Sequence, residues 1–256
     1  MKQIFVSITA HWAGAVREFI RSKLYVGLLA AGGLMVAAAA MLAELSLGET
    51  VNALVDLGMA FIALVVAALA ATVTISSVSS AIATREVIVL LARPVGRDAF
   101  VYGRSLAAIT LVLAANVILG TMLAILVAVF GGPAFKTFVA VLFASFEGII
   151  VAGIAMAFAV RSSSVLAATL TAVLFVVGRM DEALDTLLAR GTFGPLELPM
   201  RALAHGLPQL SRFDLTAWVH GDAPATSLWW AACYGLLYSA ALAAIASLRF
   251  GKRDVL

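Results

Sequence analysis

Long, nearly uninterrupted apolar segments are the feature that most limits what this chain can fold into. A helix that crosses a bilayer needs about 20 mostly apolar residues, because the hydrocarbon is about 30 Å thick and each residue rises about 1.5 Å. Six segments meet or approach this length, namely 24–43, 51–78, 106–130, 138–160, 163–178 and 228–248. The fifth is the shortest, and the second is long enough to tilt or to continue beyond the membrane.

The composition supports a membrane environment. Of 256 residues, 63% are hydrophobic and 12% are charged, whereas an average soluble domain is about 45–50% apolar and about 25% charged. So few charges cannot cover the surface of an ordinary soluble enzyme, a disordered chain or a solvated repeat protein. The sequence predicts an all-α polytopic membrane protein with six transmembrane helices in one domain, residues 1–256.

The positions of Lys and Arg predict the orientation. Twelve of the 17 basic residues fall at the N-terminus, after the second span, after the fourth span and at the C-terminus. Because short cytoplasmic loops carry the excess of Lys and Arg, we expect both termini in the cytoplasm of a bacterium and the chain in its inner membrane. Segment 179–227 has four Arg and six acidic residues and is expected outside. This topology explains the net charge of +3, so we expect no nucleic-acid partner.

The N-terminal residues 1–23 are predicted to form an amphipathic helix. One helical face is apolar, and Arg17 and Arg21 lie one turn apart on the other. Such a helix lies in the membrane interface, with its cations toward anionic headgroups. A cytosolic extension of the first span is the alternative. The apolar face comprises Phe5, Ile8, Trp12, Val16, Phe19 and Ile20.

Motifs for catalysis or metal binding are absent from the sequence. It has no phosphate-binding loop, zincin motif or dinucleotide-binding glycine turn. Cys233 is the single cysteine, and the three histidines are scattered. We therefore expect no catalytic residue, no metal and no cofactor bound by this chain itself.

Few polar or ionisable groups fall inside the predicted spans. Glu147 lies near the middle of the fourth, where a charge costs about 2.5–3.5 kcal/mol and normally faces the interior of a bundle. Asn116 and Asp56 are weaker candidates. Two interpretations stay open for Glu147: part of a pathway, or a carboxyl group that burial keeps protonated and that bonds a neighbouring helix.

The stretch 80–104 is the most informative part of the sequence. Residues 84–92 are mostly apolar and helical in pattern, arginines flank them, and Pro94 stops them. They are too few to cross a membrane, and an exposed apolar helix between two spans calls for a partner protein. A helix that rests on the lipid surface is the alternative.

The residues of this loop resemble a known family. Arg85, the run Leu90-Leu91-Ala92-Arg93-Pro94-Val95-Gly96-Arg97, then Phe100 and Gly103-Arg104 resemble the loop of the ABC type-2, exporter-like permeases. Residues 207–215, LPQLSRFDL, and the ending 249–254, RFGKRD, are similar to other stretches of that family. The layout, with a basic N-terminal helix, six spans and a long external segment before the last span, is similar as well.

This resemblance implies a permease subunit without an ATP site of its own. Segment 84–94 would be a coupling helix that docks on a cytoplasmic ABC ATPase, two copies of which would bind ATP and drive export or conformational signalling. The chain would form a homodimer among membrane lipids, with a possible external partner at 181–222, where we expect short helices over 181–189 and 196–207. The implied docking residues are Thr84, Arg85, Glu86, Leu90, Leu91, Arg93, Pro94 and Arg97, with Leu90 and Leu91 as apolar anchors.

Other classes of protein stay open on the sequence alone. A secondary transporter or channel that works alone would need a charged midplane relay or inverted repeats. An intramembrane enzyme would need paired catalytic residues, and a regulatory or assembly protein is a further alternative. The substrate and the direction of transport are not encoded in any motif.

Overall fold

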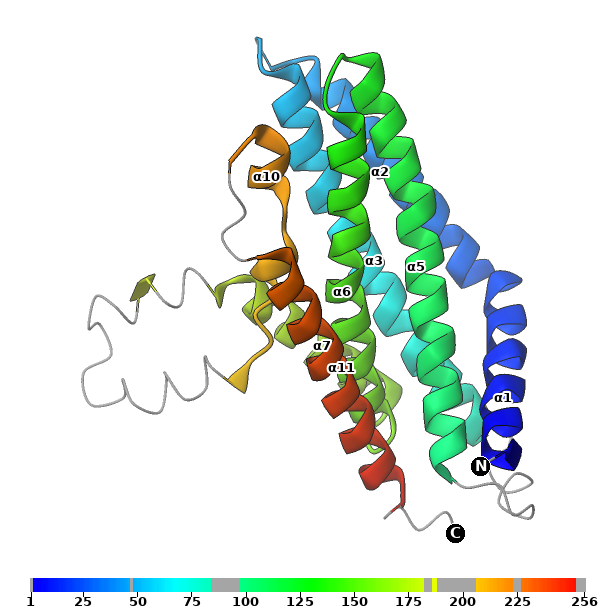
Figure 1. Ribbon diagram of the computed structural model, residues 1–256. Helices are drawn as coiled ribbons and strands as arrows, with labels where there is room; N and C mark the ends of the chain where they lie inside the picture. Colours follow the sequence, from blue (N-terminus) through cyan, green and yellow to red (C-terminus); the bar gives the residue numbers. More distant parts are fainter. Residues whose placement is uncertain are drawn as a thin grey trace.

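The computed structural model (Figure 1) describes residues 2–46, 48–83, 97–181, 186–187, 206–222 and 227–251. The regular elements in this part of the chain are all helical. They are α1 (Lys2–Ile20), α2 (Lys23–Ala43), α3 (Thr50–Ala83), α5 (Arg97–Val129), α6 (Ala134–Ala159), α7 (Ser164–Arg179), the 3-10 helix η2 (Ser211–Phe213), α10 (Thr216–His220) and α11 (Leu228–Gly251).

Five of these helices are long and apolar enough to cross a membrane. They cover Lys23–Ala43, Thr50–Ser80, Ala99–Val129, Ala134–Ala159 and Leu228–Leu248, which confirms the expectation of an all-α protein with several membrane-type helices. The remaining predicted span, 163–178, forms α7, which has 16 residues. At about 1.5 Å per residue α7 is roughly 24 Å long, shorter than the hydrocarbon of a bilayer. The count of six spans stays a prediction.

The bundle has a centre and a periphery. Among the five long helices, α3 and α6 are the most buried, and α2 and α11 are the least buried. Gly148 on α6 is the closest approach at the centre, because a Cβ there would lie 2.8 Å from Val66 of α3 and 2.8 Å from Val112 of α5. Small residues allow helices to come this close in lipid, where van der Waals contact replaces the hydrophobic drive.

The bundle has two ends, which are named by the parts of the chain that lie there. The terminal end is where α1 begins and α11 ends, and the far end is where α5 turns into α6 (Figure 1). Helices α3, α6 and α11 run from the far end to the terminal end, as close contacts show. Gly153 of α6 lies against Leu242 of α11, and Gly235 of α11 lies against Phe146 of α6.

The helices α3 and α5 extend beyond α6 at the terminal end. With Val66, Val112 and Gly148 at one level, α3 continues about six residues, roughly 9 Å, past the level where α6 ends. Helix α5 begins about four residues beyond that level. The predicted loop 80–104 is therefore helical at both ends, since α3 runs through Ala83 and α5 starts at Arg97. Residues 84–96 lie outside the described part of the chain.

Polar contacts explain why α5 begins earlier than the apolar pattern indicates. Arg104 is buried, its Nη1 donates to the carbonyl oxygen of Ser77 on α3 at 2.6 Å, and its guanidinium lies 5.0 Å from the ring centre of Phe100. The long side chain bonds the neighbouring helix instead of ending the span. Hydropathy alone counts such an arginine as a loop residue.

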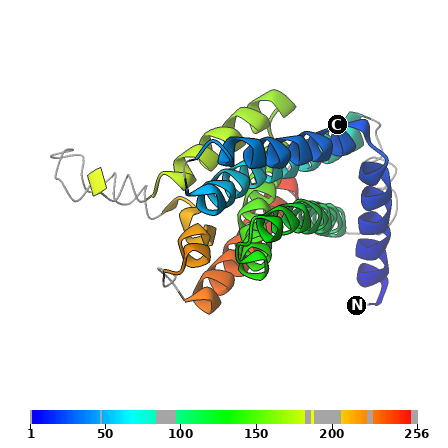
Figure 2. The same ribbon diagram turned by 90° about the horizontal axis from the view of Figure 1, so that it is seen from above.

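The N-terminal helix forms as predicted and packs along the first half of α5 (Figure 2). Ala15 and Phe19 are buried, and the indole Nε1 of Trp12 donates to Oγ1 of Thr110 at 2.9 Å. Gly103 permits the contact, because a Cβ there would lie 2.6 Å from the Cβ of His11. Arg17 and Arg21 are exposed. Its location in a membrane interface stays a prediction.

Candidate functional site

Glu147 lies in the middle of α6 with 2% of its side chain exposed, and it has a basic partner. Arg179, the last residue of α7, donates from Nε to Oε1 of Glu147 at 2.7 Å and from Nη2 to Oε2 at 3.2 Å. Two parallel bonds between guanidinium and carboxylate give a strong and orientation-specific contact. The structure shows a contact of Glu147 to a neighbouring helix, and a role of Glu147 in a pathway stays a hypothesis.

The sequence analysis placed Arg179 at the start of the external segment, and the structure shows it as the last residue of α7, bonded to Glu147. Helix α7 starts at the terminal end after the short turn that follows α6, so its sixteen residues bring Arg179 only to the level of Glu147. The helix ends about halfway along α6 (Figure 1). The signal that was available in the sequence is the short length of the fifth apolar segment, followed at once by an arginine.

Further charged groups surround Arg179. Its Nη2 lies 3.7 Å from Oδ2 of Asp214, and Oδ2 of Asp181 accepts a hydrogen bond from Oγ of Ser211 at 2.8 Å. Three carboxylates therefore lie around one guanidinium at the inner end of the 206–220 segment. Asp214 also accepts from the backbone N–H of Thr216 at 3.0 Å and so helps to start α10.

The 206–220 segment returns to the bundle beyond the end of α7. The backbone N–H of Leu210 donates to the carbonyl oxygen of Gly178 at 2.9 Å, and that of Gln209 donates to the hydroxyl of Tyr234 at 3.1 Å. Gly178 has no room for a side chain, because a Cβ there would lie 2.7 Å from the carbonyl oxygen of Pro208. The segment thus occupies the half of the bundle that α7 does not reach.

Phe213 anchors this segment and is fully buried. Its ring stacks on Phe146 of α6 and on Tyr234 of α11, with ring centres 5.8 Å and 6.2 Å apart, and it also contacts Phe143. Gly235 opens the space between α6 and α11, because a Cβ there would lie 3.1 Å from Cζ of Phe213. Burial of such a ring contributes about 1.5–3 kcal/mol through the hydrophobic effect.

At the far end, the short helix α10 bridges two long helices. Nε2 of His220 lies 2.6 Å from Oδ1 of Asp56 on α3, and the ammonium of Lys136 on α6 lies 5.6 Å from the ring centre of Trp218. Asp56 is 57% exposed, so this contact is screened by solvent and weak. Asp56 thus contacts His220, at the end of the 206–220 segment that is far from Glu147.

Asn116, the other sequence candidate, lies at the centre of the bundle on α5. It is fully buried, its Nδ2 has only a long contact of 3.4 Å to the carbonyl oxygen of Val112, and its Oδ1 has no partner. Contacts of Gly148 with Val112 and of Gly120 with Val141 set the antiparallel register of α5 and α6. This register puts Asn116 level with Ser145, whose buried Oγ also lacks a partner.

Most of the docking residues implied by the family resemblance are not among the residues that the structure describes. Thr84, Arg85, Glu86, Leu90, Leu91, Arg93 and Pro94 lie outside the described residues, and Arg97 is described only as the first residue of α5. The predicted helices 181–189 and 196–207 are likewise almost wholly outside them. What the structure does describe is the base of the loop, where α1 and α3 each pack against α5.

No model of a known protein family matches the chain, and a search of curated proteins gives no match.

Proposed function

We propose that the chain is the permease subunit of an ATP-driven ABC transporter of the type-2, exporter-like class. Two copies of a separate cytoplasmic ATPase bind and hydrolyse ATP, and this chain converts their movement into export or into a signal across the membrane. The carrying observation is the extension of α3 and α5 beyond α6 at the terminal end, on either side of segment 84–96.

The length of these two helices supports a docking role for the segment between them. Helix α3 has 34 residues and α5 has 33, so each is about 50 Å long at 1.5 Å per residue, well beyond a hydrocarbon thickness of about 30 Å. We therefore propose that segment 84–92 lies clear of the hydrocarbon and that another protein covers Leu90 and Leu91.

The packing at the base of the loop supports transmission of force. Arg104 bonds α5 to α3, and Trp12 bonds α1 to α5. A displacement at segment 84–96 therefore moves α1, α3 and α5 together, and α6, which packs against α3 and α5, follows. We propose that the N-terminal helix stiffens this base.

The remaining parts of the proposal concern orientation and assembly. The terminal end faces the cytoplasm of a bacterial inner membrane, as the distribution of Lys and Arg indicates. The permease acts as a homodimer, with the poorly buried helices α2 and α11 available for contact with a second copy or with lipid. A partner outside the cell would contact the 181–222 region.

The test is whether the chain binds an ATPase through this loop. Tagged protein is purified in mild detergent from its native host, bound proteins are identified by mass spectrometry, and ATP hydrolysis is measured. We expect a stoichiometric P-loop ATPase that is lost in Leu90→Asp, because a buried carboxylate at the anchor opposes docking. Leu45→Asp is the matched control: Leu45 is 77% exposed in the turn after α2, at the far end, and this change should leave the ATPase bound. Stoichiometric binding to the Leu90→Asp variant refutes the assignment.

A further inference from the structure

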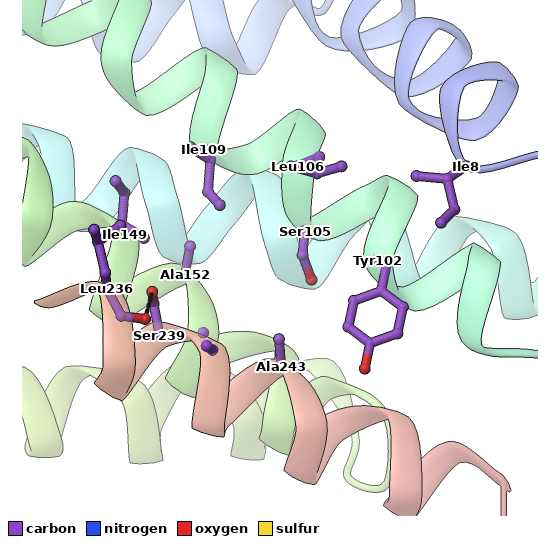
Figure 3. Close-up of a pocket in the computed structure, with 12 residues that line it drawn as sticks. Ile8, Tyr102, Ser105, Leu106, Ile109, Ile149, Ala152, Leu236, Ser239 and Ala243 are labelled. Carbon is purple, nitrogen blue, oxygen red and sulfur yellow. Dashed lines mark hydrogen bonds between the residues drawn. The ribbon is translucent and has the colours of Figure 1, made fainter. Parts of the chain in front are cut away.

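An apolar groove of about 610 Å³ opens between α5, α6 and α11, with Ile8 of α1 at one end (Figure 3). Each of the three long helices lines it with one face. On α5 the lining residues follow the helical spacing from Tyr102 through Ser105 to Ile109, and on α11 they run from Leu236 to Ala243. The groove lies in the terminal half of the bundle and is separate from the Glu147–Arg179 pair.

The groove exists because small side chains line its floor. Ala152 and Gly153 of α6 and Ala240 and Ala243 of α11 leave the space that larger residues fill elsewhere in the bundle. Helices α6 and α11 touch at Gly153, where a Cβ would lie 3.0 Å from Cδ1 of Leu242. Helix α5 lies on the other side of the opening, and its side chains extend toward α11 (Figure 3).

Polarity changes along the groove. Near the middle of the bundle the lining is mostly hydrocarbon, from Ile109, Ile149 and Leu236, and the hydroxyl of Ser239 there donates to the carbonyl oxygen of Leu236 at 2.9 Å. Toward the terminal end the lining includes Tyr102, which is 37% exposed. Its hydroxyl is available to donate a hydrogen bond to an acceptor in the groove.

The size and surroundings favour a hydrocarbon chain as the occupant. A cavity of roughly 150 Å³ holds benzene and stays dry when its lining is apolar. The groove is about four times larger, enough for one acyl chain and the glycerol ester at its end. In a membrane its opening faces lipid, and an empty hollow would forfeit the dispersion contacts that a chain provides.

We propose that this groove binds one phospholipid from the leaflet at the terminal end. Its acyl chain lies between α5 and α11, and an ester oxygen accepts a hydrogen bond from the hydroxyl of Tyr102. None of the described residues that line the groove is charged, so recognition uses the glycerol ester and not the charge of the headgroup. This inference requires only that the bundle lies in a bilayer and does not depend on an ATPase partner.

The test is retention of phospholipid on the purified chain. The protein is prepared in mild detergent, incubated with dioleoyl phosphatidylethanolamine and washed, and bound lipid is counted by native mass spectrometry. We expect one lipid per chain to survive washing. Ala243→Trp fills the groove and should lower the retained fraction about tenfold, and Tyr102→Phe should weaken binding several-fold, as expected for one lost hydrogen bond.

The matched control is Ala241→Trp on the same helix. Ala241 is exposed and does not line the groove, so this variant should retain lipid as the unmodified chain does. If Ala243→Trp does not fold, judged by its helical circular dichroism, then Ala243→Leu against Ala241→Leu makes the same comparison. The proposal fails if no lipid survives washing of the unmodified protein, or if substitutions at 243 and 241 retain equal amounts.

Discussion

Glu147 and Arg179 each carry a charge that would be costly alone within the bundle. Breaking a buried pair by removing one partner typically costs about 3–5 kcal/mol, because the remaining charge is left without compensation. Arg179 is 28% exposed and also lies near Asp214, so the loss on removing Glu147 should fall at or below the lower end of that range.

A double-mutant cycle measures this pair. We expect Glu147→Gln and Arg179→Gln each to lower the temperature of thermal unfolding in detergent, followed by tryptophan fluorescence. The double variant should lose less free energy of unfolding than the two single variants lose together. The difference, the coupling energy, should be about 1–3 kcal/mol. Glu44→Gln is the control, since Glu44 is exposed after α2. Strictly additive effects would contradict the contact.

The sequence alone could not identify Arg179 as the partner of Glu147, and the reason is physical. A buried carboxylate in an apolar run signals that it needs a partner, and this much was predicted. An arginine directly after an apolar run, however, reads as the start of a loop. Only the tertiary position of α7, which ends level with Glu147, brings the two together. Asn116 and Asp56 were correctly seen as polar residues of spans, but they contact different parts of the bundle.

Gly178 is a residue whose importance follows from backbone contact alone. In Gly178→Ala the new Cβ would lie 2.7 Å from the carbonyl oxygen of Pro208, which cannot move without displacing the 206–220 segment. We expect a loss of about 1–3 kcal/mol of stability, seen as a lower unfolding temperature. Gly33→Ala is the comparison, because its nearest neighbour would be Sδ of Met122 at 3.7 Å. An unchanged unfolding temperature in Gly178→Ala would refute the close approach.

At the scale of elements, α7 and the 206–220 segment together cover the length of α6, as a single long helix does elsewhere in the bundle. Helix α7 covers the terminal half of α6, and the returning segment with η2 and α10 covers the far half (Figure 1). The joint between them is held by Arg179, by the Leu210 N–H and by the ring of Phe213. The fold of this region is therefore set by specific backbone and side-chain contacts, which a hydropathy pattern does not reveal.

Phe213 is the residue on which this element depends most. Removing a fully buried Phe ring typically costs about 3–5 kcal/mol, and here it also frees the segment that carries Asp214. We expect Phe213→Ala to lower the unfolding temperature strongly. Leu237→Ala on α11 should have little effect, because Leu237 is 72% exposed. Equal effects of the two substitutions would show that the returning segment is not anchored by this ring.

The long helices were predicted well and their ends were not. Apolar runs of 20 or more residues located α2, α3, α5, α6 and α11, because crossing a bilayer leaves little choice of structure. The end of a helix depends on local polar contacts instead. Arg104 and Phe100 were assigned to a loop, yet they belong to α5, because α3 supplies a carbonyl oxygen for the guanidinium.

In the molecule as a whole, helix α7 ends halfway along the bundle, so counting spans does not tell which side of the membrane the later turns of the chain face. In the structure α10 contacts the first turns of α3 and α6, through Asp56 and Lys136. The turn at Gly131 and the residue Asp222 therefore lie at the same end of the bundle, while α1 begins and α11 ends at the other. This relation follows from geometry, whereas the assignment of each end to a compartment follows from the positive charges.

Reporter fusions test the two statements separately. We expect alkaline phosphatase inserted after Gly131 or after Asp222 to be active in a bacterial host, and green fluorescent protein at the C-terminus to fluoresce. Phosphatase folds only outside the cytoplasm because it needs disulfides, so its activity reports the compartment. Activity at one of the two insertion sites but not the other would contradict the arrangement of α10 against α3 and α6. Inactivity at both, with an active phosphatase at the C-terminus, would instead preserve the fold and invert its orientation. The loop between α3 and α5 would then face away from any cytoplasmic ATPase, which would rule out the proposed transporter while leaving the bundle intact.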